Sequence, residues 1–220
     1  MNIHNDLCSL IPNFRIGVIR YNDIEIGPSP QMIKGRLQTL QEALYFELEE
    51  KNVTELKGIK EWREIFKKTG KDPNRYRHSA EALYRRVKKH QYLSPVNSAA
   101  DLNNFFSLQY EIPFGIYDLD AISGPIEMRI GKEGETYEGL NGRINNLHSL
   151  IITADNEGPF GSPFVDSKRT AVTEKTKNAI QVVYLRPSAP VEEDEKLMTN
   201  VMNNFLQIHG GTGNYEIIRC

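Results

Sequence analysis

Apolar residues in the first half of the chain recur every three or four positions, which is the spacing of one helical face. A leucine stripe predicts a helix over residues 31–51, with Ser29 and Pro30 as its cap and first-turn pair. IKEWREIFKKT (59–69) and HSAEALYRRVKKH (78–90) predict two more amphipathic helices, the first ended by Gly70 and the second capped by Ser79. Ahead of these helices, the alternation in FRIGVIRY (14–21) predicts a strand.

In the second half, short β-type segments follow one another between turn signals. AADLNNFFSL (99–108) predicts a helix, and four strands are expected at residues 126–130, 136–140, 150–153 and 179–185. GKEGE and LNG supply turn residues, and a closing helix at 191–208 ends before a turn in HGGTGN. Because Pro95 cannot continue a helix, we place a domain boundary near Gln91. The pattern predicts an α+β protein: a strand plus helical extension (1–91), then a domain with a mixed or antiparallel β core and a C-terminal helix (92–220).

Composition excludes several classes of protein. No run of eighteen apolar residues is present, and MNIHNDLCSLIPNF lacks a basic start followed by an apolar block, so we expect a cytoplasmic protein with no membrane contact. Cys8 and Cys220 lie at opposite ends, which matches neither a disulfide framework nor a zinc knuckle, and we expect structural cysteines. The five histidines show no metal-ligand spacing and no nucleotide-binding loop occurs, so we expect no metal and no cofactor.

Charge is distributed unevenly along the chain. Residues 57–89 carry twelve basic and four acidic residues, a local net of +8 within a chain whose formal net charge is −2. With Trp62, Phe66, Tyr76 and Tyr84 interleaved, this basic block can supply phosphate contacts and stacking faces for RNA, and a solvated helix face is the alternative. The RNA-binding candidates are Arg75, Arg77, Arg85, Arg86, Lys88 and Lys89.

Three segments carry a family resemblance, in matching order and spacing. They are AADLNNFFSLQYEIPFGIYDLDAISG (99–124), IEMRIGKEGETYEGLNG (126–142) and VTEKTKNA (172–179). Together they resemble the B3/B4 editing domain of the phenylalanyl-tRNA synthetase β subunit. Trp62-Arg63, RHSAEALYRR (77–86) and PVNSAADLNN (95–104) are similar to the helical leader of free-standing bacterial proteins that carry the same module.

The resemblance implies a β core of the editing-domain type and a pocket that recognises the aminoacyl end of tRNA. An activated aminoacyl ester needs only an oriented water and donors for the developing oxyanion. If the chain is an enzyme, it is an aminoacyl-tRNA ester hydrolase acting in trans in translation quality control, not a complete tRNA ligase. The implied partner is tRNA or aminoacyl-tRNA, no DNA is expected, and the oligomeric state is left open.

The family's pocket residues transfer only in part. Asn104 matches the family's pocket asparagine, and Asn103 replaces the adjacent threonine. The family's histidine falls on Gly115, and its glutamate falls on Lys168, which cannot accept the hydrogen bond that glutamate accepts. The replacements form a polar loop whose cations could hold a terminal phosphate or a carboxylate, with a solvated loop as the alternative; its residues are Asp166, Ser167, Lys168, Arg169 and Thr170.

Three functions therefore remain open from the sequence. The first is a tRNA-binding protein that hydrolyses mischarged aminoacyl-tRNA in trans. The second is a non-catalytic RNA-binding module, which the missing histidine and glutamate favour. The third is a pocket for a free amino acid or small metabolite.

Overall fold

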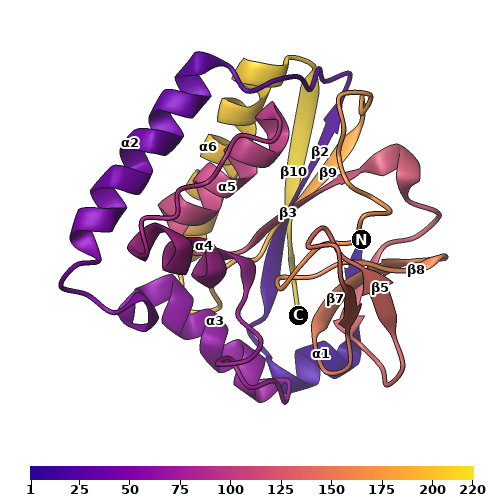
Figure 1. The fold of residues 1–220 in the computed structure, drawn as a ribbon. Coiled ribbons are helices and arrows are strands. Elements are labelled where there is room, and N and C mark those ends of the chain that lie inside the picture. Colours follow the sequence, from indigo (N-terminus) through magenta and orange to yellow (C-terminus); the bar gives the residue numbers. More distant parts are fainter.

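The computed structural model describes all residues from Met1 to Cys220. At its centre is an antiparallel sheet in the order β10-β2-β9-β3 (Figure 1). Its strands are β2 (Arg15–Asn22), β3 (Phe114–Asp118), β9 (Ala179–Val183) and β10 (Thr212–Arg219). Residues from both ends and the middle of the chain thus meet in one sheet, in which β9 pairs with β2 on one side and β3 on the other.

Helices cover one face of this central sheet (Figure 1). α5 (Ser98–Tyr110) packs on β3, α6 (Val191–His209) packs on β2 and β10, and α2 (Gln31–Glu47) and α4 (Ser79–Lys88) pack on α5. A short 3₁₀ turn (Val53–Glu55) leads into α3 (Lys57–Lys68). Gly17 on β2 permits the close approach of α6, because a Cβ there would overlap the Met198 side chain.

The opposite face of the central sheet meets a second, smaller sheet in the order β1-β4-β7-β8. β1 pairs with β4 in parallel and the other pairs are antiparallel, which confirms the α+β expectation with a mixed β core and a closing helix. The strands of this second sheet are β1 (Asn2–Ile3), β4 (Glu127–Ile130), β7 (Ile151–Asp155) and β8 (Gly158–Gly161). Between β4 and β7, the chain forms a two-stranded antiparallel ribbon of β5 (Thr136–Glu138) and β6 (Ile144–Asn146). The remaining elements are α1 (Asn5–Leu10) and a 3₁₀ turn (Leu119–Ala121).

Buried hydrophobic residues form one continuous cluster of 48 members that draws on every part of the chain. The predicted boundary near Gln91 lies between α4 and α5, two helices that pack against each other. β2, from the predicted extension, is also an interior strand of the central sheet. The extension and the remainder therefore share one core.

Two predicted helix caps are wrong. α2 starts at Gln31 after Pro30, and the Ser29 hydroxyl instead hydrogen-bonds to the Asp101 carboxylate. α4 is capped by His78, whose Nδ1 accepts from the Glu81 amide at 3.3 Å, and not by Ser79. α2 also ends at Glu47, one turn before the predicted end. Sequence signals locate a helix end to within a few residues, and tertiary contacts select the cap.

The expected isolated cysteines form a disulfide between Cys8 and Cys220, whose Cα atoms are 5.2 Å apart. A spacing rule for local frameworks cannot detect a bond between residues 212 positions apart. The predicted turn in HGGTGN is correct only for Gly210 and Gly211, which both have positive φ, because β10 begins at Thr212. β10 then carries Cys220 beside Phe14, where the Cys220 amide donates to the Phe14 carbonyl at 3.1 Å.

Candidate functional site

Asn103 is buried on the helix-covered face of the central sheet. Its Nδ2 donates to the Phe114 carbonyl at 3.1 Å, and its Oδ1 accepts from the Gln181 amide at 2.9 Å. Gln181 in turn accepts from the Tyr21 hydroxyl at 2.9 Å. Both ends of the Asn103 amide are therefore engaged in joining α5 to the sheet. Asn104 is half-buried, and its side chain makes no hydrogen bond within the protein.

Asp166 lies on the opposite side of the same sheet. Successive residues of a strand point to opposite faces. Phe114 packs on Phe106 of α5, so Tyr117 points to the second sheet, where its ring meets Phe160 of β8. Asp166 Oδ1 accepts from the Tyr117 hydroxyl at 2.8 Å. The structure thus does not bring Asn103 and Asp166 into one pocket.

Tyr117 also explains Gly115, the position of the family's histidine. A Cβ at Gly115 or at Gly161 of β8 would overlap the Tyr117 hydroxyl group. The phenol therefore lies between two glycines and occupies the space that a side chain at position 115 would take. From the sequence, Gly115 is only the position of the family's missing histidine, and Tyr117, two residues later on the same strand face, is not among the predicted site residues.

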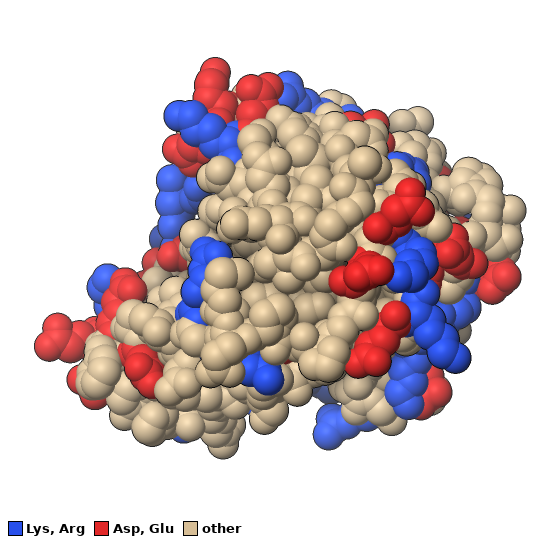
Figure 2. Space-filling view, turned by 90° about the horizontal axis from the view of Figure 1, so that it is seen from above, with Lys and Arg blue, Asp and Glu red and all other residues tan.

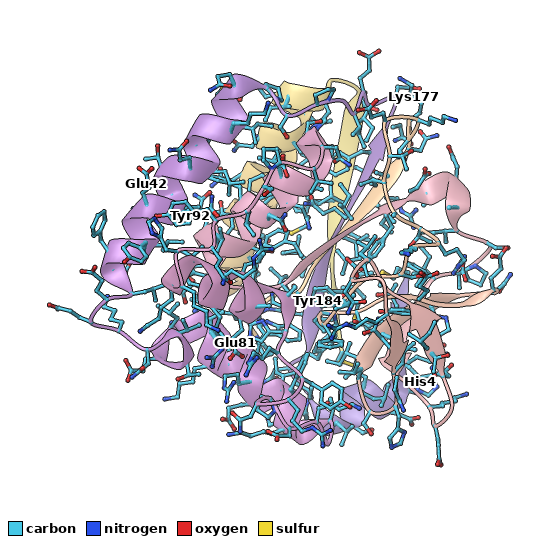
Figure 3. The ribbon with its side chains drawn as sticks, viewed as in Figure 1. His4, Glu42, Glu81, Tyr92, Lys177 and Tyr184 are labelled. Carbon is cyan, nitrogen blue, oxygen red and sulfur yellow. A yellow bond between two sulfur atoms is a disulfide. The ribbon has the colours of Figure 1, made fainter.

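The environment of Asp166 favours its protonated form. Burial raises the pKa of Asp166 to about 7, while hydrogen bonds from the Tyr117 hydroxyl and the Ser162 amide act in the opposite direction. Burial also raises the pKa of Tyr117, and the Asp166 carboxyl adds to that shift. Tyr184 lies nearby at the centre of the molecule (Figure 3). Its hydroxyl and those of Thr153 and Thr170 are buried without hydrogen-bond partners.

The remaining polar residues of the predicted loop form contacts within the protein that stabilise the loop. Arg169 forms a two-pronged contact with Asp155, at 2.8 and 3.0 Å, and reaches Glu157 at 3.2 Å. Lys168 pairs with Glu138 at 2.5 Å on the surface, and about half of each side chain is exposed. Ser167 is buried and its hydroxyl accepts from the Arg169 amide. The two cations of this loop therefore already have carboxylate partners.

In the basic block, a buried carboxylate joins two helices. Glu81 of α4 is fully buried and accepts from Arg63 of α3 at 2.9 and 3.1 Å and from Arg85 at 2.8 Å. Figure 3 shows Glu81 on the inner side of α4. Arg85, one of the RNA-binding candidates, is thus partly neutralised by Glu81.

Most cations of the block have no such partner. Only Arg63, Lys67 and Arg85 form ion pairs. Eight others are exposed and unpaired: Lys57, Lys60, Lys68, Arg75, Arg77, Arg86, Lys88 and Lys89. Arg85, Lys88 and Lys89 also line a surface hollow of about 370 Å³ that has no acidic residue in its lining.

The aromatic residues of the block are mostly unavailable for base stacking. Trp62, Phe66 and Tyr84 are buried, and the Trp62 Nε1 donates to the Tyr184 carbonyl at 3.0 Å. Only Tyr76 stays half-buried, with the Lys71 ammonium 4.1 Å above its ring. Three of these four rings therefore belong to the core, and only Tyr76 keeps a partly exposed face that a base could contact.

The face of the molecule that is seen from above (Figure 2) carries charges of both signs, and no metal site is formed. The end of the molecule seen in Figure 2 carries both signs of charge along its rim and is uncharged in the middle. No group of three or more His, Cys, Asp or Glu side chains is positioned to hold a metal ion. None of the helices combines the length and apolar character needed to cross a membrane.

Comparison with known proteins relates the chain to a defined domain. A Bacillus subtilis (strain 168) protein named Uncharacterized protein YhzB is 29% identical over 192 residues, which cover 87% of this chain and 86% of that protein. The phenylalanine–tRNA ligase beta subunit of Bartonella quintana (strain Toulouse) is 34% identical over 90 residues, or 40% of this chain and only 11% of the subunit. An N-terminal fragment of the phenylalanyl-tRNA synthetase beta subunit from Pyrococcus horikoshii superimposes with a TM-score of 0.46 at 17% identity, covering 96% of this chain and 49% of that fragment.

A family model described as the B3/4 domain matches residues 61–200, which is more than half of the chain. The match includes the last two-thirds of α3, all of α4 and most of the basic block, together with the central-sheet strands β3 and β9 and the Tyr117–Asp166 pair. The protein therefore belongs to the B3/4 domain family.

Proposed function

We propose that this protein is an RNA-binding module, with tRNA as its first candidate partner, and that it acts without hydrolysing aminoacyl esters. Its relatives include phenylalanine–tRNA ligase beta subunits, whose name states that they act on a tRNA. This chain spans about a tenth of their length. Ligase activity is therefore not part of the proposal. A cytoplasmic location remains a prediction of the proposal, whereas a role in translation quality control belongs to the hydrolase alternative that the mischarged-tRNA panel tests.

The observation that carries the proposal is the set of eight exposed, unpaired cations within residues 57–89. Phosphate groups attract such a cluster through a sequence-independent electrostatic interaction. The hollow beside Lys88 and Lys89 has room for a phosphate group, and its lining adds no negative charge. Arg86 lies in the last turn of α4 and Lys89 is the residue that follows the helix, three positions later, so both can face one stretch of nucleic-acid backbone.

Hydrolysis receives less support from the candidate pocket. A deacylase needs space for the aminoacyl end and free groups to orient it. In this chain, Asn103 and Asp166 are on opposite faces of a sheet, and Tyr117 occupies the space beside Gly115. Asp166 already accepts a hydrogen bond from the Tyr117 hydroxyl, and Lys168 already forms an ion pair with Glu138.

Binding of fluorescently labelled tRNA tests the proposal. We expect Arg86→Ala/Lys89→Ala to weaken binding at least tenfold at low salt, because two phosphate contacts are lost. The matched control is Lys132→Ala/Lys175→Ala, which removes two exposed lysines without ion pairs outside the basic block and should leave the Kd within a factor of two. Equal loss in both variants, or no binding by the wild type, would contradict the proposal.

A panel of mischarged tRNAs separates binding from editing. We expect the wild-type protein to bind these tRNAs and to leave their ester bonds intact at the rate seen in buffer. If the wild type hydrolyses any mischarged aminoacyl-tRNA and Asp166→Asn does not, the chain would be a deacylase. That result would overturn the non-catalytic part of the proposal.

A further inference from the structure

A cavity of about 250 Å³ opens where α5 and β9 end and α6 begins. It lies away from the basic block and away from the Tyr117–Asp166 pair. Its apolar wall consists mainly of Ile112, Leu185 and Leu197, with the Tyr110 ring beside them. This size and composition suit a small molecule with one apolar group, because ligand sites combine an apolar lining with a few placed polar groups.

Asp194 supplies a negative charge to this cavity. The residue is only 2% exposed, and its Oδ2 pairs with Arg15 Nε at 2.6 Å. Arg15 is held in turn by the carbonyl groups of Arg186, at 3.0 Å, and of Ala189. No protein donor hydrogen-bonds to Asp194 Oδ1. Oδ1 therefore offers a free acceptor position beside the ion pair with Arg15, and a cationic ligand group can donate to it.

Positive charge lies at the same cavity. Lys196 is exposed and has no ion-pair partner, and Arg186 contacts only Glu193, at 3.3 Å near the surface. The Asn200 side chain adds a neutral amide to the lining. A simple amine would leave the two cations unused, and a simple carboxylate would leave Asp194 unused. A ligand that carries both charges can contact all three groups, with Glu193 of the lining already paired to Arg186 and the unpaired Lys196 as the main carboxylate partner.

We infer that this cavity binds a free α-amino acid with an apolar side chain. The ammonium group would bind Asp194, the carboxylate would bind Lys196 and Arg186, and the side chain would pack on Ile112, Leu185 and Leu197. This inference is independent of the RNA proposal, because it uses none of the residues of the basic block.

Calorimetric titration and thermal denaturation with three matched probes test the inference. L-leucine carries both charges, isocaproate lacks the ammonium group, and isoamylamine lacks the carboxylate. We expect L-leucine or L-phenylalanine to bind and to raise the melting temperature in proportion to concentration. Isocaproate and isoamylamine should each bind at least tenfold more weakly, because each leaves a charged group of the site unpaired.

Variants on α6 tie the binding to this cavity. Lys196→Ala, at an exposed position where folding is not at risk, should weaken L-leucine binding about tenfold. Glu195→Ala, an exposed neighbour on the same helix that does not line the cavity, should leave the affinity unchanged. Absence of binding by every apolar amino acid, equal binding of isoamylamine, or an unchanged affinity in Lys196→Ala would overturn the inference.

Discussion

At the scale of single residues, the protonation of Asp166 links packing to pH. Its pKa is about 7 in the folded protein, against about 3.9 for an unperturbed aspartate. Because the pKa is higher in the folded protein, the Asp166 carboxyl group stabilises the fold fully below about pH 4, and this stabilisation is lost as the pH rises through about 7. We therefore expect Asp166→Asn, whose amide oxygen can still accept from Tyr117, to gain on the order of 2–4 kcal/mol relative to the wild type between pH 4 and pH 8.

Urea unfolding of both proteins across this pH range measures that difference. Other acidic groups titrate in both proteins, so only the difference between the two free energies of unfolding reports Asp166. A difference that stays constant from pH 4 to pH 8 would show that the Asp166 carboxyl group has an ordinary pKa. The residue would then be solvated and free to contact a ligand.

Residue identity alone could not reveal this arrangement. The motif match locates Gly115 and Lys168 at the family's histidine and glutamate, but it does not show which side chain fills the vacated space. Strand alternation places Gly115 and Tyr117 on one face. The contact with Gly161 depends on β8 of the second sheet, and β8 lies more than 40 positions after Tyr117 in the sequence.

At the scale of secondary-structure elements, Glu81 holds α3 and α4 together. Removing one partner of a buried ion pair leaves uncompensated charge and costs about 3–5 kcal/mol. We expect Glu81→Ala to lower the free energy of unfolding by about 3 kcal/mol, since Arg63 is 14% and Arg85 37% exposed and water offsets part of the loss. Glu64→Ala, which breaks the exposed pair with Lys67, should cost less than about 1 kcal/mol.

Denaturant titrations of the two variants check this prediction, and similar losses in both would contradict it.

The helices themselves are predictable from periodicity, because α3, α4, α5 and α6 each present a regular apolar face or a clear stop signal. The strands β6, β8 and β10 are not predictable in this way, because short or half-exposed strands show only a weak alternation of apolar and polar residues. Helix caps are also not predictable from the usual cap residues, since Pro30 precedes α2 without a side-chain hydrogen bond and the His78 ring caps α4.

At the scale of the whole molecule, the disulfide between Cys8 and Cys220 ties the first helix to the last strand. Closing a loop of 212 residues removes conformational freedom from the unfolded chain, which is worth about 5 kcal/mol in the chain-entropy description. We expect Cys8→Ser/Cys220→Ser to unfold at lower denaturant concentration than the oxidised wild type. Dithiothreitol should lower the wild-type midpoint to the variant's value and leave the variant unchanged.

A dithiothreitol-insensitive wild type would contradict this prediction. The redox state also depends on the compartment, because disulfides persist in oxidising surroundings and are rare in the cytosol. In a reducing cytoplasm, the reduced form would be the working state, held by the shared core of 48 residues.

The central claim is that the exposed cations of residues 57–89 bind the phosphate backbone of RNA. The dependence of tRNA affinity on salt tests it most directly, because each phosphate contact contributes about −0.7 to −0.9 to the slope of log K against log salt concentration. We predict a steep negative slope for the wild type that becomes shallower by about 1.5 in Arg86→Ala/Lys89→Ala. A flat slope, or one that the double substitution leaves unchanged, would contradict the account.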